Sequence, residues 1–91
     1  TETYYYYGNA DGKRLATYIQ NYVTSSLGTS NRGVKEAGVA VIKNTSMTAI
    51  LLETAFIDTA ADAAKLADDG CQWSYAESIA HGICDYFGVA Y

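Results

Sequence analysis

Three stretches of the chain show apolar positions at helical spacing. Residues 10–27 repeat apolar side chains at three- and four-residue steps, and Gly28 follows where a C-terminal cap belongs. Residues 59–68 begin with a possible N-cap threonine and stop before Gly70. Residues 72–87 carry one apolar face that we expect to pack on a core, formed by Trp73, Ala76, Ile79, Ala80, Ile83, Cys84 and Phe87.

Three other stretches predict strands. Residues 3–7 are a threonine followed by four tyrosines, whose rings would lie on both faces of a strand. Residues 39–43 form a short β-type run after the polar loop 29–33. Residues 48–53 contain four successive apolar side chains, which suits a strand covered on both faces. A buried helical turn would also fit that run, although its length favours a strand.

The predicted order is strand, helix, strand, strand, helix, helix, which indicates an α/β layer fold. The chain of 91 residues is long enough for one domain or part of one. A continuous apolar strand needs neighbours on both sides, and two or three strands make a thin sheet. We therefore expect the chain to be part of a larger domain, and its start without Met indicates processing or fragmentation upstream.

Charge excludes several kinds of partner. Six basic and ten acidic residues give a formal net charge of -4, and the basic residues are scattered. Nucleic acids and anionic membrane surfaces both require a basic patch, so neither is expected as a partner. No apolar run approaches the roughly 18 residues of a membrane span, so no membrane insertion is expected. Cys71 and Cys84 would lie about 20 Å apart along one helix, too far for a disulfide, and the redox compartment stays open.

Glu53 is the first candidate for chemistry. It ends the most apolar stretch of the chain, and sites in open α/β sheets form outside the carboxyl ends of strands. Partial desolvation at such a position raises the pKa of a carboxylate toward the range of a general base. The alternative is a strand-end glutamate held by a salt bridge or by backbone amides, and position alone favours this alternative.

For the other candidate side chains, the sequence pattern favours a structural role over a role in binding or catalysis. Arg32 and Lys35 could hold a substrate carboxylate or carbonyl, or simply belong to a solvated turn. The tyrosines of residues 4–7 could stack on sugar rings or pack in the sheet. His81 lies between Glu77 and Asp85 at four-residue steps, which suits a solvent-facing histidine supported by two acids better than a metal site.

Several segments, in this order, resemble the zinc-dependent N-acetylmuramoyl-L-alanine amidases of bacterial autolysins and phage endolysins. They are Arg32-Gly33-Val34-Lys35, the run from Val41 to Thr45 with Met47, and Ile50-Leu51-Leu52-Glu53-Thr54-Ala55-Phe56-Ile57-Asp58. The resemblance covers nearly the whole chain, and the stretch around Glu53 is its most specific part. It implies a twisted mixed sheet flanked by helices, the phosphorylase/hydrolase-like amidase fold, with residues 1–91 forming the C-terminal half of one catalytic domain.

The resemblance also implies a function. Members of the family cleave the amide between N-acetylmuramic acid and L-alanine of the stem peptide in peptidoglycan, outside the cell or in its wall. Glu53 matches their catalytic carboxylate. Their zinc ion is held by two histidines and a glutamate that all lie upstream of the matched region, and His81 matches none of these ligands. We therefore expect no zinc site and no activity in this chain alone, and the missing N-terminal half as a partner.

Two substitutions depart from the family pattern. Thr48 replaces a proline, and Ala55 replaces a glycine beside Glu53, where a positive φ would strain an alanine. Two other hypotheses stay open. The chain could be a non-catalytic module that binds muropeptide through Arg32, Lys35 and the tyrosines, or a structural piece with Glu53 in a buried ion pair.

Overall fold

A small mixed sheet and two long helices organise the chain. The computed structural model describes residues 1–56 and 59–91. In chain order the elements are β1 (Glu2–Tyr5), α1 (Ala10–Leu27), β2 (Val34–Glu36), α2 (Ala40–Lys43), β3 (Ile50–Glu53), α3 (Ala60–Ala67) and α4 (Asp69–Phe87). Ile57 and Asp58 of the family-like segment lie outside the described residues. Within the described part, no helix combines the length and apolar content needed to cross a bilayer.

The sheet has the strand order β2-β1-β3. β1 pairs with β2 in parallel and with β3 antiparallel, which confirms the predicted mixed sheet of an α/β fold. α1 makes the crossover between the two parallel strands. Asn9 begins this helix by accepting a 2.8 Å hydrogen bond from the Gly12 backbone nitrogen, and Gly28 ends it at φ 66°.

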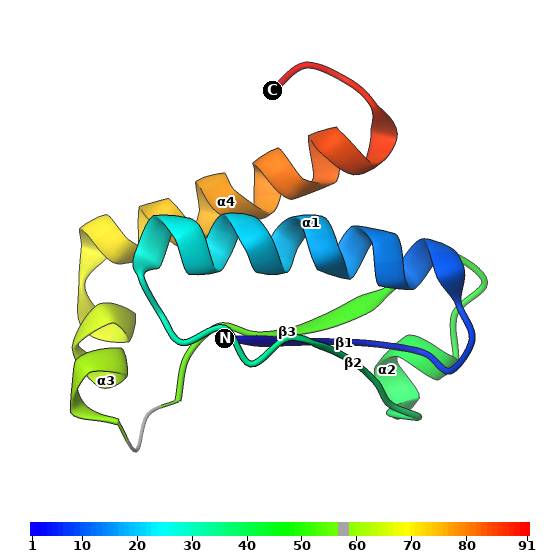
Figure 1. The fold of residues 1–91 in the computed structure, drawn as a ribbon, viewed down its shortest axis with the longest axis horizontal. Helices are drawn as coiled ribbons and strands as arrows, with labels where there is room; N and C mark the ends of the chain where they lie inside the picture. Colours follow the sequence, from blue (N-terminus) through cyan, green and yellow to red (C-terminus); the bar gives the residue numbers. More distant parts are fainter. Residues whose placement is uncertain (57–58) are drawn as a thin grey trace.

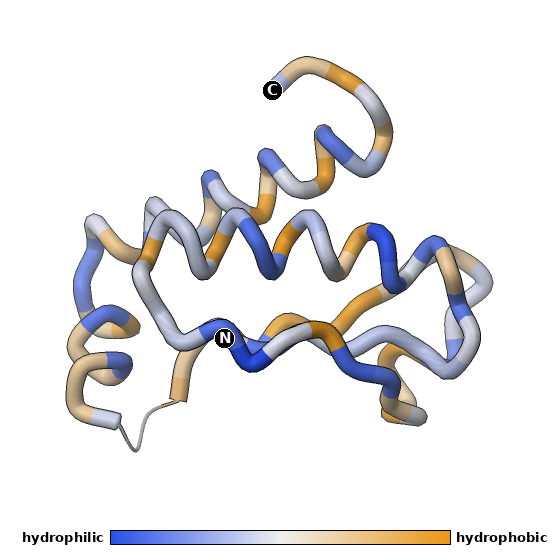
Figure 2. Tube along the Cα trace, in the orientation of Figure 1, coloured by the Kyte–Doolittle hydropathy of each residue, from blue (hydrophilic) through white to orange (hydrophobic). Residues whose placement is uncertain are grey.

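α1 and α4 lie on the same side of the sheet, and α2 and α3 lie toward its two ends (Figure 1). The core forms between α1, α4 and the sheet, where Ile19, Val23 and Tyr75 are buried and Ile50 and Leu52 of β3 pack against them. Figure 2 shows apolar positions where α1 faces the strands. One face of β3 is therefore covered by helices of this chain.

The predicted strand at residues 39–43 is wrong. The chain forms the single helical turn α2 there, with Ile42 buried and Val41 68% exposed. The strand beside β1 is instead Val34–Glu36, at the end of the predicted loop, and the Ala37 backbone nitrogen adds a 2.9 Å hydrogen bond to Tyr5 O. Pairing with β1 decides this, because β propensity is a weak preference that tertiary contacts override.

The predicted core face of α4 is only partly right, because Ile79 packs against the core while most of the other large side chains of that face are exposed. The buried positions are Tyr75, Ser78 and Gly82, whereas Trp73 is 70% and Phe87 69% exposed. The glycine at position 82 lets α4 approach α1 closely, because an added Cβ there would lie 2.5 Å from Ile19 Cγ1. The other boundaries differ from the predictions by a few residues, with β1 ending at Tyr5 and α4 beginning at Asp69.

Both cysteines are half-buried, and neither forms a disulfide in the described residues. Cys71, rather than Cys84, packs against the core cluster. Burial is the main cause that raises the pKa of the Cys71 thiol, and a hydrogen bond with Asp68 adds to it. The structure thus agrees with a structural role for this thiol.

Candidate functional site

Glu53 is the last residue of β3 and lies directly opposite Glu2 in the antiparallel pair. Its side chain is exposed, so the hypothesis of a buried ion pair is not supported. Because opposite residues in a ladder point to the same face, the two carboxylates share one face of the sheet. Thr3, the next residue of β1, points to the opposite face, toward α1, and donates a 2.8 Å hydrogen bond to Gln20 Oε1.

Glu2 is buried, with 4% of its surface exposed, and its carboxylate is fully engaged. Tyr4 Oη donates to Oε1, Lys35 Nζ donates to Oε2, and Arg32 Nε lies 3.5 Å from Oε2. The hydrogen bond from Lys35, followed by that from Tyr4, holds the pKa of the Glu2 carboxyl below its usual range. Such partners are what make a buried carboxylate tolerable.

Glu2 was not among the predicted site residues. One sequence signal could have indicated it, because Glu2 and Tyr4 are two residues apart and therefore lie on the same face of a strand. Glu2 and the side chains that contact it, Tyr4, Arg32 and Lys35, are called the Glu2 cluster. Lys35 of this cluster comes from β2 and pairs with Tyr4 across a parallel ladder. The ladder brings Lys35 to Glu2, which lies 33 residues away in the sequence, and no local pattern indicates such a contact.

Arg32 and Lys35 are therefore not a freely solvated turn. Gly33, at φ 86°, turns the chain from Arg32 into β2, and the Asn31 side chain accepts a 2.9 Å hydrogen bond from the Gly33 nitrogen. The side chains of Arg32 and Lys35 remain 52% and 47% exposed while they contact Glu2. Each cation thus has one anchored side and one side open to a ligand.

A cleft of about 260 Å³ adjoins Arg32. Its lining residues are Ser30, Arg32, Phe56, Thr59 and Asp62. The Arg32 guanidinium lies 4.5 Å from the centre of the Phe56 ring. Asp62 Oδ2 accepts a 3.0 Å hydrogen bond from the Phe56 nitrogen, while Thr59 caps α3 without a side-chain hydrogen bond. The segment that follows Glu53 is thereby tied to the start of α3.

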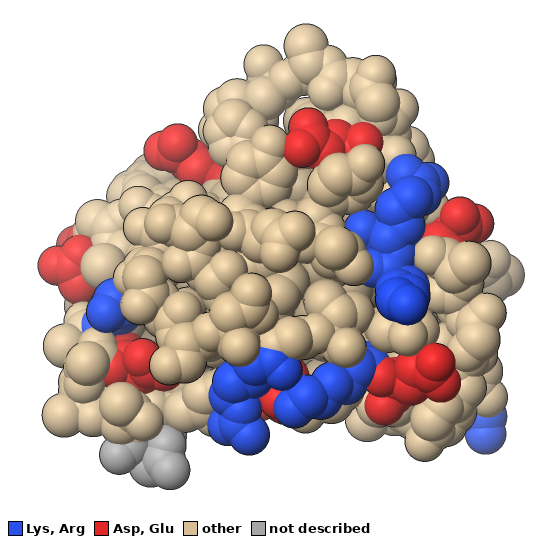
Figure 3. Space-filling model, in the orientation of Figure 1, with Lys and Arg blue, Asp and Glu red and all other residues tan. Residues whose placement is uncertain are grey.

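The electrostatic effect of Glu53 reaches the same cluster. The pKa of the Tyr4 hydroxyl is raised first by its hydrogen bond to Glu2 and by burial, and the charges of Glu2 and Glu53 add to this. Figure 3 shows lysine and arginine side chains gathered over the strands with acidic atoms beside them. The structure therefore brings Glu53, Arg32 and Lys35 into one region around Glu2.

The two substitutions from the family pattern cause no visible strain. Among the described residues, positive φ angles occur at glycines alone, so Ala55 takes an ordinary backbone conformation. The concern about alanine at this position is therefore wrong. The Thr48 hydroxyl lies 3.1 Å from Tyr86 Oη, which links the start of β3 to α4.

The surroundings of His81 do not suit a metal ligand. Its ring stacks between Tyr22 and Tyr91, with ring centres 5.2 Å and 3.6 Å away. Asp85, expected to support His81, instead accepts a 2.7 Å hydrogen bond from Tyr22 Oη. In residues 1–56 and 59–91, no group of three histidine, cysteine, aspartate or glutamate side chains is placed to hold a metal ion. These residues by themselves therefore do not fit zinc.

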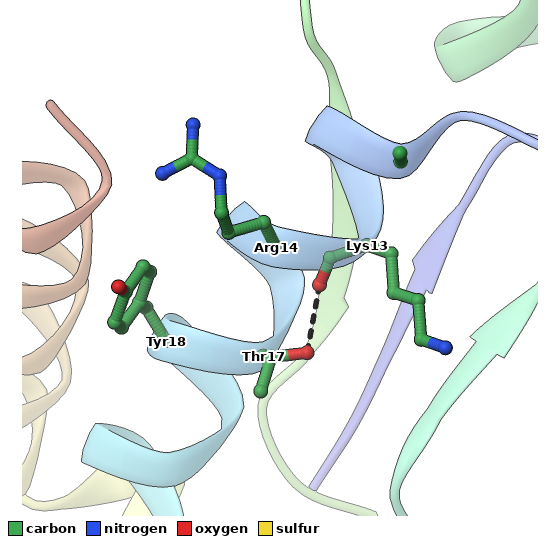
Figure 4. Close-up of a pocket in the computed structure, with 5 residues that line it drawn as sticks. Lys13, Arg14, Thr17 and Tyr18 are labelled. Carbon is green, nitrogen blue, oxygen red and sulfur yellow. Dashed lines mark hydrogen bonds between the residues drawn. The ribbon is translucent and has the colours of Figure 1, made fainter.

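A second groove, of about 420 Å³, runs along α1 and is lined by Ala10, Lys13, Arg14, Thr17 and Tyr18. Figure 4 shows Lys13 and Arg14 pointing to opposite sides of the helix. Arg14 donates a 2.9 Å hydrogen bond to the backbone carbonyl of Tyr86, and its guanidinium carbon lies 4.2 Å from the centre of the Tyr86 ring. The two cations do not converge on a ligand, so the groove is not a candidate site.

Comparison with known proteins agrees with the family resemblance seen in the sequence. Residues 1–85 match the family model described as N-acetylmuramoyl-L-alanine amidase. The amidase LytC of Bacillus subtilis is 44% identical over 89 residues, which are 96% of this chain and 18% of LytC. Among solved structures, an amidase of Clostridium difficile has a TM-score of 0.90 at 31% identity, with 96% of this chain and 47% of that chain covered.

The catalytic domain of the amidase CwlV from Bacillus (Paenibacillus) polymyxa has a TM-score of 0.87 at 34% identity, covering 98% of this chain and 49% of that domain. The chain thus spans about half the length of the solved amidases that it matches. The sequence match and the fold agree. This chain belongs to the N-acetylmuramoyl-L-alanine amidase family.

Proposed function

We propose that this chain is the C-terminal portion of a peptidoglycan amidase domain, with Glu53 as its catalytic carboxylate. The reaction is hydrolysis of the amide between N-acetylmuramic acid and L-alanine of the stem peptide. The observation that carries the proposal is the place of Glu53, exposed at the end of β3 beside the anchored cations of the Glu2 cluster. Peptidoglycan is then the partner, and the cell wall or the extracellular space the place of action.

Glu53 suits proton transfer in amide hydrolysis. A carboxylate at this position takes the proton of an attacking water and passes it to the leaving amine. Zinc, when bound, lowers the pKa of a water molecule and polarises the carbonyl. Because the described residues do not offer a zinc donor set, its ligands are expected to come from outside these 91 residues.

Arg32 and Lys35 are proposed to bind substrate. Glu2 engages Lys35 Nζ and the Nε side of Arg32, which fixes both side chains in position. The remaining guanidinium donors of Arg32 can hold a carboxylate or carbonyl of the stem peptide in bidentate fashion. Phe56 adds an aromatic ring whose centre lies 4.5 Å from the guanidinium carbon.

The test needs a longer protein that contains this chain together with the upstream zinc ligands. We expect Glu53→Gln to abolish release of peptides from purified cell walls while far-UV circular dichroism and zinc content stay unchanged. Glu77→Gln, at an exposed glutamate of α4, is the matched control and should keep full activity. Full activity of Glu53→Gln would remove the catalytic role. Wall binding by the parent protein without any peptide release would support the muropeptide-binding alternative instead.

A further inference from the structure

Two opposite charges line the cleft beside Arg32. Arg32 comes from the loop before β2, and Asp62 comes from the first turn of α3. In residues 1–56 and 59–91, Arg32 pairs with Glu2, and Asp62 takes part in no ion pair. A cation and an anion therefore border one space without neutralising each other, which suits a ligand that carries both charges.

Both charged groups are held in place before any ligand arrives. The Arg32 backbone nitrogen donates a 2.9 Å hydrogen bond to Thr1 O, and its Nε lies 3.5 Å from the Glu2 carboxylate. Asp62 Oδ2 accepts its 3.0 Å hydrogen bond from the Phe56 nitrogen, and Oδ1 accepts none from the described residues. A site fixed in this way loses little conformational entropy when it binds a ligand.

The neutral lining and the size of the cleft indicate a single amino-acid residue as its ligand. Ser30 and Thr59 contribute hydroxyl groups, and the Thr59 hydroxyl is not used to cap α3. Phe56 contributes an aromatic ring that can pack against aliphatic carbons. At about 260 Å³, the cleft is smaller than the roughly 300–1,000 Å³ of pockets that enclose whole small molecules. It therefore has room for one side chain and not for a disaccharide.

We propose that this cleft is a specificity subsite for a stem-peptide residue whose side chain ends in a carbon with both an ammonium and a carboxylate, as in a diamino dicarboxylic acid. The remaining guanidinium donors of Arg32 hold the carboxylate, and Asp62 Oδ1 accepts the ammonium. The subsite rests on the proposed function, because it names the residue of the substrate that the amidase site selects. It assigns Asp62 a role in substrate binding.

The cleft lies at the same end of the sheet as Glu53. Glu53 stands opposite Glu2 at the start of β1, and Figure 1 shows α3 beyond that end of the sheet. Phe56 follows Glu53 by three residues, a span of at most about 10 Å. A peptide extends by about 3.3–3.6 Å per residue, so a stem residue two positions after L-alanine lies about 7 Å beyond it. That residue can therefore occupy the cleft while the amide before L-alanine is at Glu53.

The same two charges disfavour a side chain with a single charge. A lysine side chain would bring its ammonium to Asp62, but it would leave Arg32 without an anion and be repelled by that guanidinium. A side chain whose ammonium is acylated would leave Asp62 unmatched in the same way. Selection thus comes from the mismatched charge as much as from the matched one.

The test measures binding of peptides that the enzyme does not cleave. The protein is the longer one that contains this chain and the upstream zinc ligands, and the ligands are tetrapeptides of the form L-alanyl-D-glutamyl-X-D-alanine. They carry no muramyl amide, so their Kd, measured by isothermal titration calorimetry, does not depend on catalysis. X is meso-2,6-diaminopimelic acid, the same residue acetylated on its side-chain amine, or lysine. We expect the diaminopimelic acid peptide to bind about 30-fold more tightly than each of the other two, which is typical for one charge-assisted hydrogen-bonded pair.

Two variants assign the charges to their residues. Arg32→Gln should weaken binding of the diaminopimelic acid peptide about 30-fold and should not weaken binding of the lysine peptide. Asp62→Asn keeps an oxygen that accepts from the Phe56 nitrogen but removes the charge. It should weaken binding of the diaminopimelic acid peptide to a similar extent and leave binding of the acetylated peptide unchanged. Asp69→Asn, the same change at an exposed position of α4, is the matched control and should bind all three peptides like the parent protein.

Equal affinity for the three peptides, tighter binding of the lysine peptide, or no binding of any of them would overturn the subsite. Failure of the proposed function looks different, since it is the absence of peptide release from cell walls by the same protein. A protein that cleaves walls but does not distinguish the peptides would lose the subsite and keep the amidase function. One that distinguishes the peptides without cleaving walls would keep the subsite as part of a binding module.

Discussion

Replacing Gly82 by alanine tests the close packing of α4 on α1. An added Cβ would lie 2.5 Å from Ile19 Cγ1 and 3.0 Å from the Ile19 backbone Cα and nitrogen. The backbone atoms cannot rotate away, so the helices must separate, and overpacking of this kind costs about 1–3 kcal/mol. Alanine favours a helix over glycine by about 1 kcal/mol. Because two of the three close atoms belong to the backbone, we expect the overpacking cost in the upper part of that range, about 2–3 kcal/mol, which leaves a net destabilisation of about 1–2 kcal/mol.

The assay is urea and thermal unfolding of the 91-residue chain followed by far-UV circular dichroism. The loss corresponds to a decrease in melting temperature on the order of 10 °C for a domain of this size. Gly70→Ala is the matched control, because its Cβ would meet only the Asp68 carboxylate oxygen at 3.1 Å. That oxygen caps α4 but belongs to a side chain that can shift, so this variant should lose less stability than Gly82→Ala. A Gly82→Ala chain as stable as the parent would refute the close approach of the two helices.

Three further predictions concern buried polar groups and the thiol. Gln20→Ala should lower the free energy of unfolding by about 2–3 kcal/mol, measured by urea unfolding, because the side chain is 1% exposed and bonds Thr3, Thr1 O and Asn31. Since Lys35 lowers the folded-state pKa of Glu2 from 4.5, Glu2 stabilises the fold above that pH, and this contribution is lost as the pH falls through the lowered pKa. Glu2→Gln should therefore flatten the fall in stability below about pH 4.5, and an unchanged acid limb would contradict the predicted linkage. Cys71 should react with iodoacetamide more slowly at pH 8 than a model thiol, because burial raises its pKa, and urea should remove the difference.

Local sequence patterns were sufficient for the long elements and for the position of Glu53. The apolar periodicity of residues 10–27 and the capping residues beside it predicted α1 with its observed bounds. The apolar run before Glu53 predicted β3, although the observed strand begins at Ile50 and not at residue 48. These predictions hold because periodicity, capping and strand propensity depend on neighbours within a few residues.

Pairing across the sheet was beyond such patterns. Val34–Glu36 became a strand, and residues 40–43 became a helical turn, because β1 pairs with the former. The same pairing buries Glu2 between Tyr4 and Lys35 and so makes the cluster beside Glu53. The loop pattern indicated Arg32 and Lys35 as candidate ligand-binding cations, but not the carboxylate of Glu2 that positions them.

α4 separates the two kinds of information most clearly. Its sequence determined that residues near 72–87 form a helix with one strongly apolar face. Tertiary structure alone decided that the opposite side packs on α1, through Ser78 and Gly82, while Trp73 and Phe87 stay exposed. The physical reason is that hydrophobic spacing reports how apolar each face is, whereas close packing depends on the shape of the neighbouring helix. A glycine beside Ile19 fits where no larger side chain can.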